Sequence, residues 1–155
     1  MAYHMSLMFS IIKHTLLLLV ITFTSVVTYA KDTGVVYDIT ILSVIDGDTV
    51  VISAPYLPPP LKPQLAIRVY GVDTPEKGFR AKCDSERARS ERARNFTAQV
   101  IERAKSHQML LMKWDKFGGR IIGDVILDGK SLREMLISNG HAREYYGERK
   151  HSWCN

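Results

Sequence analysis

The first 30 residues of the 155-residue chain contain no Asp or Glu and only one lysine, Lys13. The apolar run from Leu16 to Val27 is about 12 residues long, which is too short to cross a bilayer as a helix. Small residues at Thr28 and Ala30 suit the cleavage site of a signal peptidase. We therefore expect residues 1–30 to be a secretory signal peptide; an uncleaved membrane anchor is the alternative.

Cleavage after Ala30 would leave residues 31–155, which is enough chain for one domain with one core. The cleaved part would remove one lysine and no acid, so the formal net charge would fall from +5 to +4. A modest positive charge suits an anionic partner such as nucleic acid, although many inert proteins share it. We expect a monomer that is exported, either periplasmic or secreted, with no stable membrane association after cleavage.

Cysteine is also scarce: the chain has only Cys83 and Cys154, so only one pairing within the chain is possible. In an oxidising compartment an even count favours a disulfide, and two unpaired thiols are the alternative. A bond would hold the polar tail, which reaches Trp153 near the chain end, beside the loop that follows Glu76.

Several motifs of other enzyme classes are missing. His107, His141 and His151 are widely spaced and lack the close spacing of zinc ligands, so we interpret them as surface or structural residues. The sequence has no Gly-rich phosphate loop and no Gly-x-Ser-x-Gly elbow. A zinc enzyme, a P-loop enzyme and a serine hydrolase of the α/β type therefore find no support.

Alternating apolar residues predict strands, and an apolar stripe at helical spacing predicts a long helix. Prolines fill five of the nine positions from Pro55 to Pro63, which predicts a loop because proline cannot donate to a strand ladder. Strands are expected at 35–44, 49–52, 65–72, 109–113 and 120–127, and helices from Asp84 or Ser85 to about Ser106 and from Ser131 to Asn139-Gly140. The fold expected is α+β but mainly β, a five-stranded OB-type barrel with two or three helices; a sandwich with packed helices is the alternative.

Two acidic turns stand next to predicted strands, Asp46-Gly47-Asp48-Thr49 and Asp73-Thr74-Pro75-Glu76. Taken alone, each is an ordinary turn, since Asp-Gly is the commonest hairpin signal. Carboxylates from two turns can also converge on one hard cation, which prefers several oxygen ligands. Arg68 lies five residues before Asp73 on the same predicted strand. Its planar fork can grip a phosphate and keeps its charge near neutral pH.

Glu76 and a second arginine, Arg120, complete this pattern. Glu76 stands just beyond the proposed metal ligand, where it could take a proton from a water. Two guanidinium groups, a cation and one spare carboxylate are what phosphodiester hydrolysis requires, because its transition state gains negative charge.

Four segments resemble staphylococcal nuclease and the wider thermonuclease family. They are Val44 to Thr49 (Val-Ile-Asp-Gly-Asp-Thr), Ile67 to Glu76 (Ile-Arg-Val-Tyr-Gly-Val-Asp-Thr-Pro-Glu), Asp115 to Arg120 (Asp-Lys-Phe-Gly-Gly-Arg), and Asp128-Gly129-Lys130 with the helix after it. The resemblance covers about residues 36–146. It implies an OB-type barrel, a calcium ion (Ca2+) as cofactor, and endonuclease action on DNA and RNA that leaves 3′-phosphates.

The resemblance also implies a role for each matching residue of the metal site. Asp48 and Asp73 would be carboxylate ligands of calcium, and Thr74 would add its backbone carbonyl. Asp46 matches a family residue that lies near the ion without being a direct ligand.

Other residues match the catalytic and substrate-binding positions of the family. Glu76 would be the general base that acts on the attacking water. Arg68 and Arg120 would hold the phosphate and stabilise the transition state. Lys116 would help to bind a terminal phosphate, and Tyr146 would stack on a base, although a plain surface tyrosine is an equal alternative for Tyr146.

Three features depart from the family pattern. An extra glycine, Gly118 or Gly119, precedes Arg120, so the reach of this arginine is less certain than that of Arg68. Phe117 replaces a tyrosine, which removes one hydroxyl contact to phosphate. The proline loop at 55–63 is longer than the family hairpin.

A secreted, calcium-dependent nuclease is the function that these residues favour. The alternative is a non-catalytic OB-fold module that binds single-stranded nucleic acid, because OB barrels often bind without chemistry. Such a module has no need for Asp48, Arg68, Asp73 and Glu76 together, so the full set favours an enzyme. It also disfavours a structural cell-surface protein.

Overall fold

The computed structural model of the chain describes residues 35–154. The expected signal peptide at 1–30 lies outside the described residues. Within residues 35–154, no helix is both long enough and apolar enough to span a membrane.

A seven-stranded sheet forms the body of the protein, in the order β1-β6-β7-β4-β3-β2 with β8 paired to β7. All pairings in this sheet are antiparallel except that of β4 with β7. The strands are β1 (Val36–Asp38), β2 (Ile41–Asp46), β3 (Thr49–Ser53), β4 (Gln64–Val69), β6 (His107–Trp114), β7 (Arg120–Leu127) and β8 (Lys130–Ser131). The five predicted strands are thus present, but two of them are divided. The first forms β1 and β2, and the third, expected at 65–72, ends at Val69 and is followed after Gly71 by a separate strand, β5 (Val72–Asp73).

The sheet closes on itself through the segment that carries β1 and β2. Only Ile39 and Thr40 separate these strands, yet β1 pairs with β6 and β2 pairs with β3 at the opposite end of the strand order. The backbone of Ile39 donates to His107, and Ser53 donates to the carbonyl of Thr40, so pairing continues through the break. One stretch of chain therefore joins both edges of the sheet, which gives the OB-type fold expected from the sequence.

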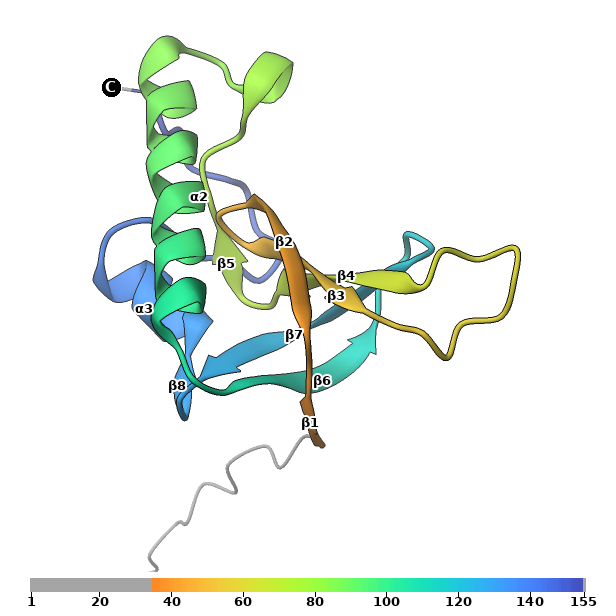
Figure 1. The fold of residues 1–155 in the computed structure, drawn as a ribbon. Helices are drawn as coiled ribbons and strands as arrows, with labels where there is room; N and C mark the ends of the chain where they lie inside the picture. The colour runs from red at the N-terminus through yellow and green to blue at the C-terminus, as the bar shows by residue number, and fades with distance from the viewer. Residues whose placement is uncertain (1–34, 155) are drawn as a thin grey trace, which may run out of the picture. The chain divides into compact units, whose positions relative to one another are not determined.

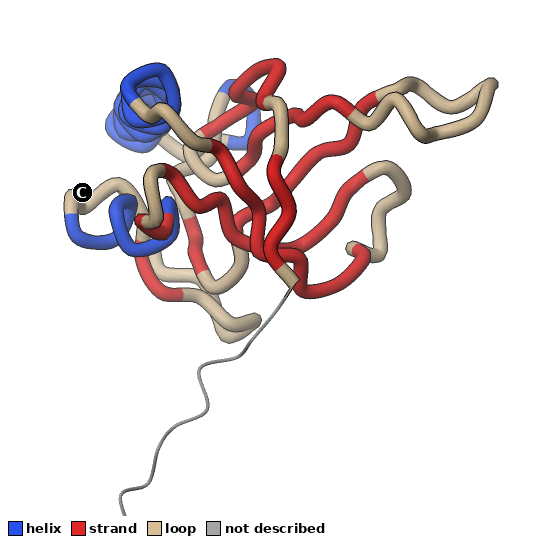
Figure 2. Tube along the Cα trace, turned by 60° about the horizontal axis from the view of Figure 1, so that its bottom comes forward, coloured by secondary structure: helices blue, strands red, loops and turns tan. Residues whose placement is uncertain are grey.

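The core fills the inside of this sheet. Val50, Ile52, Ile67 and Val69 alternate along β3 and β4 and are almost fully buried, as the two-residue period of a strand requires. Helix α3 (Leu132–Ser138) adds Leu132, which is also fully buried, to the same core. Figures 1 and 2 show the helices gathered on one side of the strands, while the proline loop between β3 and β4 extends away from them.

Helix α2 (Asp84–Arg103) packs against the turn between β2 and β3. The Thr97 hydroxyl donates to the carbonyl of Gly47 at 2.7 Å. A Cβ atom on Gly47 would lie only 2.8 Å from that of Ala93, so the turn approaches the helix as closely as a glycine permits. The predicted apolar stripe, which includes Phe96 and Val100, is only half-buried.

The ends of both helices follow recognisable capping rules. Ser131 accepts from the backbone of Glu134 at the start of α3, as the predicted capping box requires, and Gly140 follows the helix at a φ of 70°. Helix α2 begins differently from the prediction: its N-cap is Cys83, not Asp84 or Ser85. The Cys83 sulfur accepts from the backbone of Glu86, which fills the place of a capping oxygen.

After α3 the chain returns to the edge of the barrel. Strand β9 (Arg143–Glu144) pairs with β5 (Val72–Asp73) as a separate two-stranded sheet. The last residues then run to the start of α2, beside which Figure 1 places the chain end. A disulfide there joins Cys83 to Cys154 across a sequence separation of 71 residues.

Candidate active site

Asp48 and Arg68 meet across neighbouring strands. The antiparallel register of β3 and β4 sets Thr49 opposite Arg68, which brings the arginine beside the preceding residue, Asp48. Arg68 Nη1 donates to Asp48 Oδ1 at 3.0 Å. Asp48 is only 1% exposed, and its second oxygen, Oδ2, has no hydrogen-bond partner among the described residues.

Burial raises the pKa of Asp48 to about 7, because a charge loses its hydration there. The charge of Arg68 opposes this rise and the neighbouring Asp46 adds to it. Asp46 also has a buried oxygen, Oδ1, without a hydrogen-bond partner in the described part of the chain. Buried acidic oxygens left without partners are the donor set that a hard cation such as calcium satisfies, so these residues fit the expected metal.

Asp73 lies at the end of β5 and is 4% exposed. Its Oδ2 accepts a hydrogen bond from Trp153 Nε1 at 2.9 Å. Its Oδ1 forms an ion pair with Lys150 Nζ at 2.6 Å. Thr74 follows directly and is also buried.

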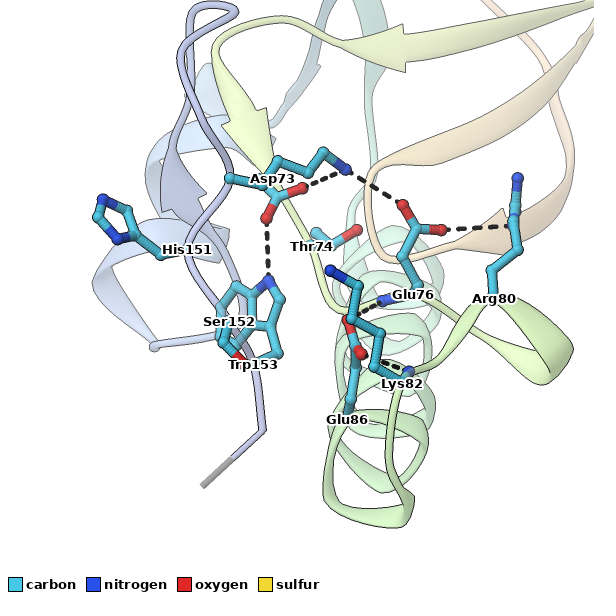
Figure 3. A pocket seen from close by; sticks show the side chains of 10 residues that line it. Asp73, Thr74, Glu76, Arg80, Lys82, Glu86, His151, Ser152 and Trp153 are labelled. Atoms are coloured by element: carbon cyan, nitrogen blue, oxygen red, sulfur yellow. Dashed lines mark hydrogen bonds and ion pairs between the residues drawn. The ribbon is translucent and has the colours of Figure 1, made fainter.

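Two hollows flank the segment from Thr74 to Glu76. One is a cavity of about 200 Å³ whose lining includes Asp48, Arg68 and Arg120. The other, of about 240 Å³, has Asp73 in its wall and is drawn in Figure 3. Thr74 and Glu76 line both, so the two expected metal carboxylates face different hollows with the expected base between them.

The carboxylate of Glu76 lies between two cations. Lys150 Nζ is 3.1 Å from its Oε1, and Arg80 Nε is 3.4 Å from its Oε2. The backbone beneath is fixed by Glu86, which is 4% exposed. The N–H groups of Glu76 and Lys82 both donate to the Glu86 carboxylate, at 3.2 and 2.8 Å. Helix α2 therefore holds the loop that presents Glu76 (Figure 3).

Arg120 reaches the same cavity as Arg68 despite the extra glycine. The parallel register of β4 and β7 sets Ala66 opposite Arg120, two residues before Arg68. Its guanidinium forms an ion pair with Asp115 and lies 4.7 Å from the centre of the Phe117 ring. Gly119, in the turn before Arg120, has a φ of 76°.

The two predicted substrate-binding residues lie further out. Lys116 is exposed, with its ammonium 5.2 Å from the Phe117 ring, and it lines neither of the two hollows. Tyr146 lines a third hollow of about 210 Å³, which also includes Arg68. The Tyr146 hydroxyl accepts from Arg133 Nη2 at 2.6 Å. The structure thus brings Tyr146, but not Lys116, into contact with a space that Arg68 shares.

Sequence reasoning missed Lys150, Arg80 and Glu86, and it placed Trp153 in the disulfide-bonded tail without its contact to Asp73. Glu86 carried a usable signal, because an acid three residues after an N-cap is the position that reaches back to backbone N–H groups. Lys150 and Trp153 carried none, since they lie more than 70 residues from the groups they contact.

One family profile matches the chain over residues 66–153, and its description is staphylococcal nuclease homologue. That match covers more than half of the 155 residues. Asp46 and Asp48 precede it, so their place in the site comes from the structure. The chain matches no curated protein. From the matched span, and from a fold and cavity that agree with it, the chain belongs to the staphylococcal nuclease homologue family, a family of nucleases.

Proposed function

We propose that this protein is an exported, calcium-dependent endonuclease that hydrolyses phosphodiester bonds of DNA, RNA or both and leaves 3′-phosphates. The observation that carries the proposal is the cavity of about 200 Å³ that Asp48, Arg68, Glu76 and Arg120 line together. It combines a buried carboxylate, two guanidinium groups and the expected base in one place. A phosphodiester that enters would meet these groups, while Asp73 faces the neighbouring hollow on the other side of Thr74.

Asp48, Asp73 and the backbone carbonyl of Thr74 would hold the calcium ion. All three offer oxygen, which calcium prefers and which is a poor donor set for zinc in competition with nitrogen and sulfur sites. When bound, the ion would offset the negative charge of the phosphate and of the transition state.

The two arginines would bind the phosphate and stabilise the charge that develops on it. An ion pair with a carboxylate orients each guanidinium: Arg68 pairs with Asp48, and Arg120 pairs with Asp115. A guanidinium held at one edge still has donors free at another, so each can keep its partner and contact a phosphate oxygen.

Glu76 would take the proton from the attacking water. Its side chain is 35% exposed, so a water can reach it, and the loop beneath is fastened to α2 through Glu86. Lys116 and Tyr146 would contact parts of the strand beyond the scissile phosphate, a charge for another phosphate and a ring for a base.

Digestion of single-stranded DNA, duplex DNA and RNA tests the proposal, each with calcium and with excess chelator. Cleavage with calcium, no cleavage with chelator and no restoration by zinc are expected. Analysis of the product ends for a 3′-phosphate shows which of the two ester bonds of the phosphodiester is cut. Binding of single strands without cleavage under any of these conditions would favour the non-catalytic OB-fold module.

Export is supported by the acid-free start of the sequence and by the disulfide between Cys83 and Cys154, a bond typical of oxidising compartments. Amino-terminal sequencing of protein recovered from outside the cytoplasm should begin at Lys31. A start at Met1 would instead favour an uncleaved anchor.

A further inference from the structure

The C-terminal tail, residues 147–154, is fastened to the barrel at its far end. Cys154 is bonded to Cys83 at the start of α2. Trp153 is 5% exposed, and the Arg143 guanidinium lies 3.9 Å from the centre of its ring. Arg143 also donates to the carbonyl of Ser152 at 2.9 Å. Trp153 therefore has little freedom to move.

The side chain of Lys150, unlike that of Trp153, is free to move. Its side chain is 40% exposed and ends in an ammonium group on a flexible stem. That ammonium lies between Asp73 and Glu76, 2.6 Å from Asp73 Oδ1 and 3.1 Å from Glu76 Oε1. Two groups of the tail thus contact the Asp73 carboxylate: the Trp153 indole, which is fixed, and the Lys150 ammonium, which can move.

The two oxygens of Asp73 are consequently in different situations. Oδ2 is held by the buried Trp153 indole at 2.9 Å, while Oδ1 contacts the partly exposed Lys150 ammonium at 2.6 Å. Calcium binds carboxylate oxygens at about 2.3–2.6 Å. An ammonium at 2.6 Å occupies the space that such an ion would need.

We propose that Lys150 is a tethered cation that competes with the divalent ion for Asp73, and that Trp153 is a positioning residue that holds Asp73 in the orientation for binding. This rests on the proposed function, in which Asp73 is a ligand of calcium. Calcium binding and the contact between Lys150 and Asp73 exclude each other, so the apparent calcium affinity is reduced by the fraction of protein in which Lys150 is displaced.

The two residues should therefore affect calcium affinity in opposite directions. Loss of the Lys150 charge removes the competitor and a nearby repulsion, so affinity rises. Loss of the Trp153 N–H frees the Asp73 carboxylate to rotate, so affinity falls. A tail that served only to stabilise the fold would move both variants in the same direction.

Calorimetric titration of the oxidised, metal-free protein with calcium chloride tests this. We expect Lys150→Met to bind calcium roughly 3- to 10-fold more tightly, in line with a partly exposed ion pair. Lys150→Arg, which keeps the charge, should remain near the parental affinity. Lys105→Met removes an exposed lysine at the other end of α2 and should leave the affinity unchanged. Trp153→Phe should bind roughly 3- to 10-fold more weakly, as loss of one hydrogen bond predicts.

Each outcome bears on a separate claim. The Lys150 side chain is 40% exposed, so Lys150→Met should fold normally. Parental or weaker calcium affinity in this variant would overturn the proposal that Lys150 competes with calcium. Parental affinity in Trp153→Phe would overturn its positioning role, and circular dichroism without calcium checks that this variant is folded. If neither the parent nor Lys150→Met gives any heat of binding, the protein does not bind calcium, and the calcium dependence in the proposed function is wrong.

Discussion

The guanidinium of Arg68 and the buried carboxylate of Asp48 hold each other at 3.0 Å, so one residue expected to bind phosphate orients one expected to bind metal. Arg68→Lys preserves the charge but loses the planar fork, and an ammonium cannot contact Asp48 and a phosphate with the same geometry. We expect the rate of cleavage to fall by roughly 100-fold or more. A nuclease assay under calcium saturation measures this loss.

Arg103→Lys is a matched control, because Arg103 is exposed in the last turn of α2 and lies outside the site. It should cleave at the parental rate. Cleavage by Arg68→Lys at the parental rate would show that Arg68 is not part of the catalytic machinery.

Glu76→Gln keeps the size of the side chain but removes its ability to accept a proton. Since general-base catalysis contributes about 100-fold or more, kcat should fall by that order, while nucleotide binding stays roughly intact because no phosphate contact is lost. Single-turnover kinetics and a direct binding assay separate the two quantities. An unchanged kcat would assign the proton transfer to another group.

The strands and the polar residues of the cavity were predictable from local sequence. Alternation fixes which side of β3 and β4 faces the core, and the same register then brings Asp48, Arg68 and Arg120 to one cavity. The division of the first strand into β1 and β2 was not predictable. It depends on which edge of the closed sheet each half meets.

Helix α2 shows how far a local pattern reaches. Its apolar stripe, which includes Phe96 and Val100, packs against the core but stays half-buried, whereas Thr97 and Ala93 are fully buried. They are buried because the turn at Gly47, 50 residues away from Thr97, packs against that side of the helix. Periodicity carries no information about a backbone carbonyl at such a distance. Glu86 is buried for a similar reason, as the acceptor for a loop that precedes the helix.

Asp48 should make the stability of the metal-free protein depend on pH. Its pKa is about 7 in the folded chain against an ordinary 3.8, so between these values the folded state binds more protons than the unfolded state. Stability contributed by this group therefore falls as pH rises from about 4 to about 7. Asp48→Asn removes this titration. The free energy of unfolding of the variant should therefore increase relative to that of the parent as pH rises, by at most about 4 kcal/mol.

Urea unfolding of both proteins in chelator, at about pH 4.5 and about pH 7.5, measures this difference. Calcium should then stabilise the parent at pH 7.5 and have a much smaller effect on Asp48→Asn, because the variant lacks an anionic ligand. A stability difference between the two proteins that is the same at both pH values would contradict the raised pKa of Asp48.

The disulfide should stabilise the fold and keep the tail in place. The chain-entropy treatment gives about 4 kcal/mol for a loop as long as the one that Cys83 and Cys154 close. Replacement of both by serine isolates this effect, since serine at position 83 can still cap α2 by accepting from Glu86. Urea unfolding in chelator should show a loss of that order, and the oxidised parent should be about 2 Da lighter than its reduced form. Faster backbone hydrogen exchange at positions 153 and 154 is expected in the variant, because without the bond the chain end can open locally. Equal stability of the parent and the double variant would mean that Trp153 and Arg143 alone fix the tail.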